Sequence, residues 1–406
     1  MLIMAEKMLP FGRKDRRTAN AIVVRDTGIV DIGQASALRR TYPRDRMLDL
    51  GSAVLMPGLV NVHAHLELPS LMGRVRPSDY AQWVLDLLAA KRELSQGDYF
   101  RAADDNIRTL IKTGTTTVGE ICTHGASPVL IRQHGLRAVV FHEIIAMGPG
   151  SSPLLPRGLT STSLVVQGLS PHSPHTVSEE ALAFIRDRAR ERGLRLCMHV
   201  GETIDERRLL RGERGGLDRL FQAAGWQRTW APRARTSVEY LFRMRVLSRS
   251  FLAVHAVHID TSDIALLKRR EASVAHCPRS NHAMQVGTMP LRKLLDAGVT
   301  VGIGTDSLAS VPTLNLWDEM RFAFKKHSPH GPSPRDILRL ATTGGAKALG
   351  LEKAIGTLEP GMKADIIAVP MPRRLSGDLA ADLLRETKSC IMTMVNGTIL
   401  QLEQKR

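Results

Sequence analysis

Eight short apolar runs, separated by longer segments that mostly have helical periodicity, constrain the fold of this chain more than any other sequence feature. Alternation of this kind predicts repeated strand–helix units and a parallel sheet. Eight units between residues 59 and 349 are what a (β/α)8 TIM-type barrel requires. An open doubly wound sheet is the alternative, but the Gly-x-Gly-x-x-Gly turn of dinucleotide-binding sheets does not follow the first run.

The predicted barrel strands are 59–66, 115–121, 137–144, 164–169, 195–202, 252–259, 273–278 and 300–306. The predicted helices include 78–94, 178–192, 236–247, 262–270, 289–297, 314–326 and 333–349. This alternation places the chain in the α/β class.

The two ends of the chain have a different sequence pattern from this central part. Short strand-like pieces occupy 1–8, 21–25 and 28–33 near the start and 355–358, 365–370 and 391–402 near the end. Asn396-Gly397 is a typical hairpin turn. We therefore expect residues 1–57 and 351–406 to form one small β-sandwich domain, and residues 58–350 to form the barrel.

The composition, 43% hydrophobic and 24% charged, is that of a globular chain. It contains no apolar stretch of the roughly 18 to 20 residues that a membrane helix needs, and its start lacks the order of a signal peptide. We therefore expect a cytoplasmic protein without a membrane partner. The four cysteines are far apart, which excludes a disulfide framework and a zinc ribbon.

Lys and Arg number 56 against 40 Asp and Glu, so the formal net charge is +16, which raises the hypothesis of nucleic-acid binding. Against it, the arginines are scattered and aromatic residues make up only 4%, too few for rows of base-stacking side chains. The one tight basic cluster, Arg13, Lys14, Arg16 and Arg17, is interpreted as a solvated turn between strands.

Seven of the fourteen histidines fall at the C-terminal ends of predicted strands. In a barrel these ends meet at one mouth, where the active sites of this fold lie. A single histidine there is more often a hydrogen-bonded core residue, but seven together predict a functional site. They are His63, His65, His142, His172, His199, His255 and His276.

Four residues at these strand ends predict a metal site. His63 and His65 lie at i and i+2 of one strand and therefore share a face. His199 and Asp306 each end an apolar run. Three neutral imidazoles and one carboxylate suit Zn²⁺ with a position left open for water, and Fe²⁺ or Mn²⁺ accept the same ligands.

Two further residues could move protons beside this metal. Glu202 follows His199 by three residues and could transfer a proton between water and a ring nitrogen or leaving group. A helix cap or a surface ion pair is the alternative role for Glu202. His255 ends the next strand and could orient the attacking hydroxide, whereas His258 is interpreted as a supporting residue.

Five ordered motifs in the barrel resemble those of the amidohydrolase superfamily. They are Pro-Gly-Leu-Val-Asn-Val-His-Ala-His at 57–65, His-Val-Gly-Glu at 199–202, His-Ala-Val-His at 255–258, His-Cys-Pro-Arg-Ser-Asn at 276–281 and Gly-Thr-Asp-Ser-Leu-Ala-Ser at 304–310. The segment 356–366 extends the resemblance into the C-terminal part. The branch it is most similar to contains methylthioadenosine/S-adenosylhomocysteine deaminases, aminodeoxyfutalosine deaminase, guanine deaminase and triazine hydrolases.

The resemblance implies one divalent metal ion held by His63, His65, His199 and Asp306. It implies that metal-bound hydroxide attacks an amidine-like ring carbon, with His255 and Asp306 orienting and deprotonating it. Glu202 would protonate the adjacent ring nitrogen before ammonia leaves. A homodimer is also implied.

Substrate contacts are expected from four residues by the same resemblance. His172 matches a substrate-contacting histidine of the family, whose neighbouring tyrosine is His175 here. Gln82 precedes Trp83 where methylthioadenosine deaminases usually carry a glutamate that holds ribose hydroxyls, and His142 stands where they tend to carry an arginine.

The leading hypothesis is therefore a metal-dependent hydrolytic deaminase of an adenine-containing nucleoside of the aminodeoxyfutalosine, S-adenosylhomocysteine or methylthioadenosine type. Elements around residues 66–68 and 141–143 favour the aminodeoxyfutalosine group slightly. A hydrolase of another N-heterocycle, such as guanine or an s-triazine, is the alternative among enzymes. A basic nucleic-acid-binding protein on a decayed barrel is the alternative of another class.

Overall fold

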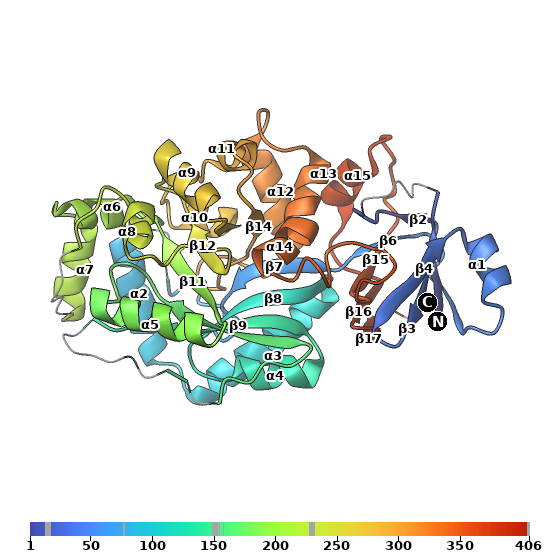
Figure 1. The fold of residues 1–406 in the computed structure, drawn as a ribbon, viewed down its shortest axis with the longest axis horizontal. Coiled ribbons are helices and arrows are strands. Elements are labelled where there is room, and N and C mark those ends of the chain that lie inside the picture. The colour runs from blue at the N-terminus through green and yellow to red at the C-terminus, as the bar shows by residue number, and fades with distance from the viewer. Residues whose placement is uncertain are drawn as a thin grey trace.

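The structure, a computed structural model, describes residues 1–12, 18–75, 78–147, 153, 155–156, 158–226 and 232–403. The basic cluster within 13–17 lies outside the described residues, so the turn expected there stays a prediction. Two parts are visible in Figure 1: a barrel ringed by helices, and a smaller two-sheet part at its right.

The eight central strands form one parallel sheet in chain order. A parallel bridge from Ala64 to Asp306 and the bond from the Thr305 amide to the His63 carbonyl (3.0 Å) bring the first strand beside the last, as in the predicted (β/α)8 barrel. The strands are β7 (Leu59–Ala64), β8 (Thr115–Cys122), β9 (Arg137–Ile144), β10 (Val165–Pro171), β11 (Arg195–Val200), β12 (Phe251–His255), β13 (Ser273–His276) and β14 (Val301–Ile303).

Helices cover the outside of this sheet and part of its mouth (Figure 1). Those that match a predicted helix are α2 (Tyr80–Arg92), α5 (Glu179–Glu191), α8 (Ser237–Arg243), α9 (Thr261–Arg269), α11 (Leu291–Asp296), α12 (Leu316–His327) and α13 (Pro334–Arg339), the last continued by a π-turn η1 (Leu340–Gly344) and α14 (Gly345–Ala348). The others are α3 (Gln96–Lys112), α4 (Ser127–His134), α6 (Ile204–Arg211), α7 (Gly216–Ala224) and α10 (Pro278–Ala283).

Both ends of the chain contribute to the two-sheet part. One sheet has the order β4-β3-β1-β5 and the other β17-β16-β15-β6-β2, and β6 from the start pairs antiparallel with β15 from the end. Side chains of both sheets share one buried apolar cluster, so the small β-sandwich is confirmed. The strands are β1 (Leu2–Met4), β2 (Lys7–Met8), β3 (Ala21–Arg25), β4 (Gly28–Gly33), β5 (Met47–Asp49), β6 (Ala53–Pro57), β15 (Ile366–Pro370), β16 (Met392–Val395) and β17 (Thr398–Leu402); helices α1 (Ala35–Thr41) and α15 (Leu379–Glu386) accompany them.

Two predictions at the chain ends were wrong in detail. Residues 1–8 are two strands, one in each sheet, because the chain crosses between the sheets after Met4. Residues 355–358 form no strand, because Gly356 takes a left-handed φ of 99° and Ile355 and Leu358 enter different cores. The turn at Asn396-Gly397 is as predicted, with φ of 51° and 81°.

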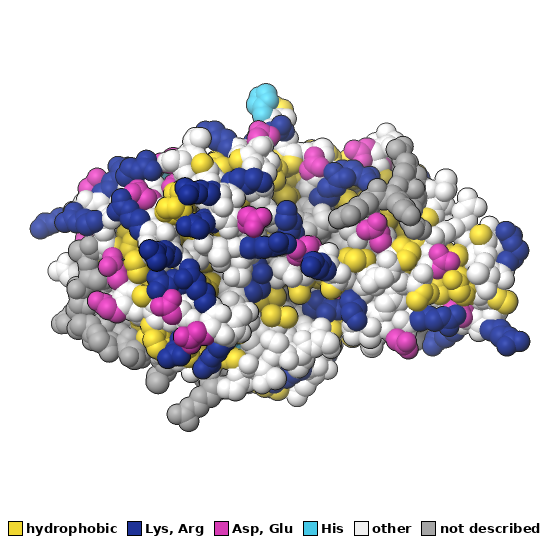
Figure 2. Space-filling view, viewed as in Figure 1, with side chains coloured by type: hydrophobic (Ala, Val, Ile, Leu, Met, Phe, Trp, Pro, Cys, Tyr) yellow, Lys and Arg dark blue, Asp and Glu magenta, His cyan; other side chains and the backbone are white. Residues whose placement is uncertain are grey.

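On the face shown in Figure 2, the described residues carry their positive charge broadly. Figure 2 shows Lys and Arg side chains spread over the helices of the visible face, interspersed with fewer Asp and Glu. This face therefore offers no single basic stripe for a nucleic acid to follow. Among the described residues no helix is both long and apolar enough to cross a membrane, and the four cysteines are free and buried.

Candidate metal centre and active site

Three histidines form a tight group at the mouth of the barrel. His63 and His65 come from β7 and the loop just after it, and His199 comes from β11; each offers a ring nitrogen within 4.8 Å of the others. His63 is fully buried, and neither of its ring nitrogens has a hydrogen-bond partner. Because buried polar atoms are normally paired, an unpaired imidazole inside such a group fits a bound cation.

Asp306 completes this group from the segment after β14. Its Oδ1 lies 3.7 Å from Nε2 of His63 and 3.5 Å from Nε2 of His65. Its Oδ2 accepts hydrogen bonds from the hydroxyls of Ser280 and Ser310, which fixes the carboxylate. Although burial alone would raise the pKa of Asp306, the adjacent His63 and the other nearby histidines outweigh it and lower that pKa.

The histidines are prepared to act as neutral ligands. Burial lowers the pKa of His65 to about 4 and holds the pKa of His199 well below its usual value, with neighbouring histidines adding to the shift. Nδ1 of His199 lies 2.9 Å from the His172 carbonyl and therefore carries the ring proton. Nε2 then keeps the lone pair that can bind a metal ion. Three nitrogens and one oxygen suit Zn²⁺, so the residues fit the metal that the sequence predicts.

Glu202 and His255 lie together beside this group. Both are buried, and Oε1 of Glu202 lies 3.2 Å from Nε2 of His255. Nδ1 of His255 lies 2.8 Å from Oδ1 of Asn281, an acceptor, so Nδ1 carries the ring proton and Nε2 is free to take another. Burial raises the pKa of Glu202, while the nearby His255 and a hydrogen bond from Tyr80 act in the opposite direction.

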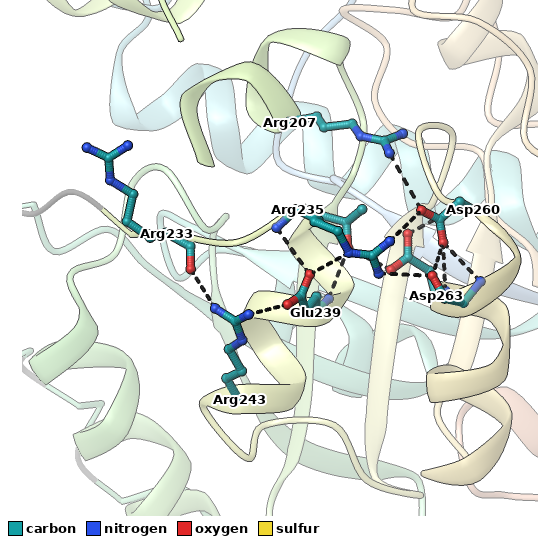
Figure 3. A network of polar contacts seen from close by, with 9 residues as sticks. Arg207, Arg233, Arg235, Glu239, Arg243, Asp260 and Asp263 are labelled. Atoms are coloured by element: carbon teal, nitrogen blue, oxygen red, sulfur yellow. Dashed lines mark hydrogen bonds and ion pairs between the residues drawn. The ribbon is translucent and has the colours of Figure 1, made fainter. Parts of the chain in front are cut away.

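Polar contacts fix the segment that follows His255. Figure 3 shows Asp260 and Glu239 surrounded by arginines, with Arg235 reaching both carboxylates. The Thr236 hydroxyl donates to Asp263 over 2.6 Å, which ties the start of α8 to the first turn of α9. The loop between His255 and α9 is therefore held at its far end.

A cavity of about 170 Å³ opens onto these residues. Its walls are largely apolar and aromatic, and its polar groups gather at the barrel mouth, as in small-molecule sites. The lining includes His65, His172, His175, His199, Glu202, His255 and Asp306 from the strand ends, Tyr80, Trp83, Val84, Leu87, Leu88 and Lys91 from α2, and Thr123, Glu143, Leu220, Trp226 and Met284.

The predicted substrate contacts divide into two groups. His172 and Trp83 line the cavity. Gln82 and His142 are not among its lining residues: Gln82 is exposed and donates to Asp86, and His142 shares a 2.8 Å hydrogen bond with Gln167. The structure therefore does not bring these two residues to the site, because Gln82 points away from the helix face that carries Trp83, and His142 points to the opposite side of its strand from Glu143.

Sequence reasoning missed Tyr80, Lys91 and Glu143 in the cavity and Asn281 behind His255. Helix periodicity could have found the first two, because positions 80, 83, 84, 87, 88 and 91 share one face of α2. Strand alternation could have found Glu143, because it points to the opposite side of β9 from His142.

The model of the amidohydrolase family matches residues 54–400. The chain belongs to the amidohydrolase family. At the barrel mouth, this amidohydrolase has a buried Glu202–His255 pair beside three converging histidines.

Known proteins resemble this amidohydrolase along almost its whole length. A 5-methylthioadenosine/S-adenosylhomocysteine deaminase of Moorella thermoacetica is 31% identical over 399 residues, covering 93% of this chain and 89% of that protein. The structure of Helicobacter pylori aminofutalosine deaminase with methylthio-coformycin has a TM-score of 0.85 at 21% identity, covering 98% and 99% of the two chains. An adenosine deaminase from Xanthomonas campestris with bound zinc has a TM-score of 0.82 at 24% identity, covering 98% and 92%.

Proposed function

We propose that this amidohydrolase is a zinc-dependent hydrolytic deaminase of an adenine-containing nucleoside. The observation that carries the proposal is the buried Glu202–His255 pair, 3.2 Å apart, beside three converging histidines in an aromatic cavity. The relative from Moorella thermoacetica is named a deaminase of such nucleosides, which supports the same substrate class.

The metal would be held by His63, His65, His199 and Asp306. When bound there, Zn²⁺ lowers the pKa of a coordinated water toward about 7 and so supplies a nucleophile at neutral pH. Iron and manganese accept the same donors, so the proposal for zinc rests on the donor set and on the zinc found in one structural relative.

The chain's own residues would move the protons. Nε2 of His255 is free to accept a proton from the attacking water, because Asn281 holds the other ring nitrogen. Glu202, whose pKa is raised by burial, would give its proton to the ring nitrogen beside the attacked carbon and would regain one from the new hydroxyl group as the carbonyl forms. The proton that His255 accepts would pass to the leaving amine. The carbon–nitrogen bond then breaks, ammonia leaves and a ring carbonyl remains.

The cavity walls would bind the purine. Trp83, Trp226 and Met284 offer flat or polarisable apolar surface, and His172 lines the cavity beside β10. Nδ1 of His172 lies 2.9 Å from the Thr176 hydroxyl, which fixes its ring.

The test is ammonia release by zinc-loaded protein from adenosine, methylthioadenosine, S-adenosylhomocysteine, aminodeoxyfutalosine, guanine and s-triazines. We expect release from at least one adenine nucleoside and none from the triazines. Turnover of guanine or a triazine alone would replace this proposal with the other hydrolase hypothesis.

A further inference from the structure

A second buried carboxylate lies behind the turn that carries Glu202. Glu206, in the first turn of α6, is fully buried. Its Oε1 accepts hydrogen bonds from the Gly201 amide over 2.8 Å and from the Ser237 hydroxyl. Glu206 therefore ties the segment just before Glu202 to the start of α8.

The turn at Gly201 depends on this contact. Gly201 takes a left-handed φ of 59°, and its carbonyl accepts from the amides of Val257 (3.0 Å) and His258 (2.8 Å). The peptide groups of Gly201 are thus held from two sides. Because Glu202 follows Gly201 directly and His255 comes just before Val257, these contacts also fix the 3.2 Å spacing of the Glu202–His255 pair.

The Glu206 carboxylate is buried without a strong cation beside it. Within the described ranges no lysine or arginine lies within 4 Å of it, and Nδ1 of His175 lies 3.8 Å from its Oε2. Burial raises the pKa of Glu206 to about 7, with the charge of Glu202 adding to the rise and His255 acting against it. Glu206 therefore changes its charge near neutral pH.

The other charged groups of this part of α6 are occupied elsewhere. Asp205 pairs with Arg208 at 3.0 Å, and Arg207 lies 3.5 Å from Asp260 (Figure 3). The titratable side chains that face Glu206 from the other elements are therefore those named above together with Tyr80 of α2.

Tyr80 lies close to both carboxylates. Its hydroxyl hydrogen-bonds to Glu202, and its ring is edge-on to that of His175, with centroids 6.5 Å apart. Burial is the largest cause that raises the pKa of Tyr80, and Glu202 and Glu206 both add to it. In a buried setting two such carboxylates act on each other strongly, because little water screens their charges.

We propose that Glu206 is a positioning residue that keeps the proton on Glu202. One oxygen of Glu206 holds the turn that presents Glu202, and the negative charge of Glu206, once formed, disfavours a second charge on Glu202. His175 faces that charge and can donate to it from Nδ1. The inference rests on the proposed deaminase function and deepens it: Glu202 stays protonated, and so able to act as an acid, to a higher pH than it would alone.

The test compares the pH dependence of kcat/KM in zinc-loaded parent, Glu206→Gln and Glu206→Leu, with the nucleoside of the panel above that the parent deaminates fastest. Glutamine keeps an oxygen for Gly201 and Ser237 but cannot ionise. We expect the alkaline limb of its profile to move down by about one pH unit, so that kcat/KM falls roughly tenfold on that limb and less at acidic pH. Glu206→Leu also loses the turn contact, so its kcat should fall at every pH. The exposed Glu213→Gln variant is the matched control and should keep the parent profile.

An alkaline limb that does not move in Glu206→Gln, or a loss of kcat/KM that is equal at all pH values, would overturn the proposal, because a merely structural glutamate would behave in that way. Infrared titration of the zinc-loaded protein gives a readout without turnover. The carboxylic-acid band that is missing in Glu202→Gln reports the proton on Glu202, and its titration midpoint should fall in Glu206→Gln. If the parent releases no ammonia from any nucleoside, the proposed function fails, while a lower midpoint still supports the role of Glu206 and an unchanged midpoint overturns it.

Discussion

The two ends of the barrel bury charged groups in opposite ways, and strand β9 shows both. At its start, Arg137 forms paired 2.8 and 2.9 Å contacts with Asp365 of the two-sheet part, and Asp365 also accepts from the Asn396 amide. Near its end, Glu143 faces the cavity and the histidine group.

At the mouth, buried polar groups remain unsatisfied and the backbone is unusual. Both nitrogens of His63 lack partners, and His255 and Asp306 take left-handed φ values of 69° and 63°. Such features persist only where surrounding structure enforces them, and they gather at active sites. The comparison teaches that the junction of the two parts holds a buried ion pair with its partners in place, whereas the mouth holds a buried imidazole whose nitrogens have none.

Of the changes predicted here, metal removal should reduce activity the most. Its effect should be confined to the barrel mouth. We expect chelation to reduce ammonia release by roughly a thousandfold or more, because the metal ion is what would lower the pKa of the attacking water toward about 7. Activity should return with added Zn²⁺, with one metal bound per chain by elemental analysis. Full activity in metal-free protein would contradict the assignment of the four ligands.

Glu202→Gln should have the second largest effect on activity. Its kcat should fall by about 10²- to 10⁴-fold, which is the contribution of a general acid–base. Metal content should not change, because Glu202 is outside the ligand group. The exposed Glu213→Gln variant is the control. If Glu202→Gln loses its metal as well as its activity, Glu202 helps to hold the metal group, and its role as a proton carrier is not established.

Arg137→Met should damage stability at the other end of the same strand. The change leaves Asp365 buried without its partner, which typically costs about 3 to 5 kcal/mol of unfolding free energy. The kcat of the remaining folded protein should stay within twofold, because Arg137 lies at the far end of β9 from the cavity. Denaturant titration and steady-state kinetics measure the two effects.

The double variant Arg137→Met/Asp365→Asn is the control for this ion pair, because the asparagine keeps an oxygen for the Asn396 amide and carries no charge. It should recover more than half of the lost stability. No recovery would mean that packing of the Arg137 side chain, not the buried charge, explains the loss.

The sequence predicted the strands well, and the four expected metal ligands lie close together, because strand ends can be read from apolar runs and a barrel brings all of them together. It misplaced Gln82 and His142, because adjacent helix positions differ by about 100° and adjacent strand positions face opposite ways, so an error of one residue moves a side chain out of the cavity. Residues 355–358 were misread because burial in two separate cores resembles a strand pattern.

The smallest predicted effect concerns Glu206, which is buried behind the mouth and accepts from the Gly201 amide (2.8 Å) and the Ser237 hydroxyl. Burial raises the pKa of Glu206 to about 7, above its unfolded value of 4.5. The folded state therefore keeps a proton that the unfolded state has lost, so this group reduces stability as pH rises from 4.5 to 7.

Glu206→Gln should remove this decrease of stability with rising pH. The amide oxygen can still accept from Gly201 and Ser237, so at pH 5 the variant and the parent should have similar unfolding free energies. At pH 8 the variant should be more stable by up to about 3 kcal/mol, the equivalent of the pKa shift. Urea titrations at the two pH values, with Glu213→Gln as the exposed control, measure the difference. A variant less stable at both pH values would show that Glu206 is held as a carboxylate, like Asp365 at the opposite end, and would place it with the satisfied charges of the fold.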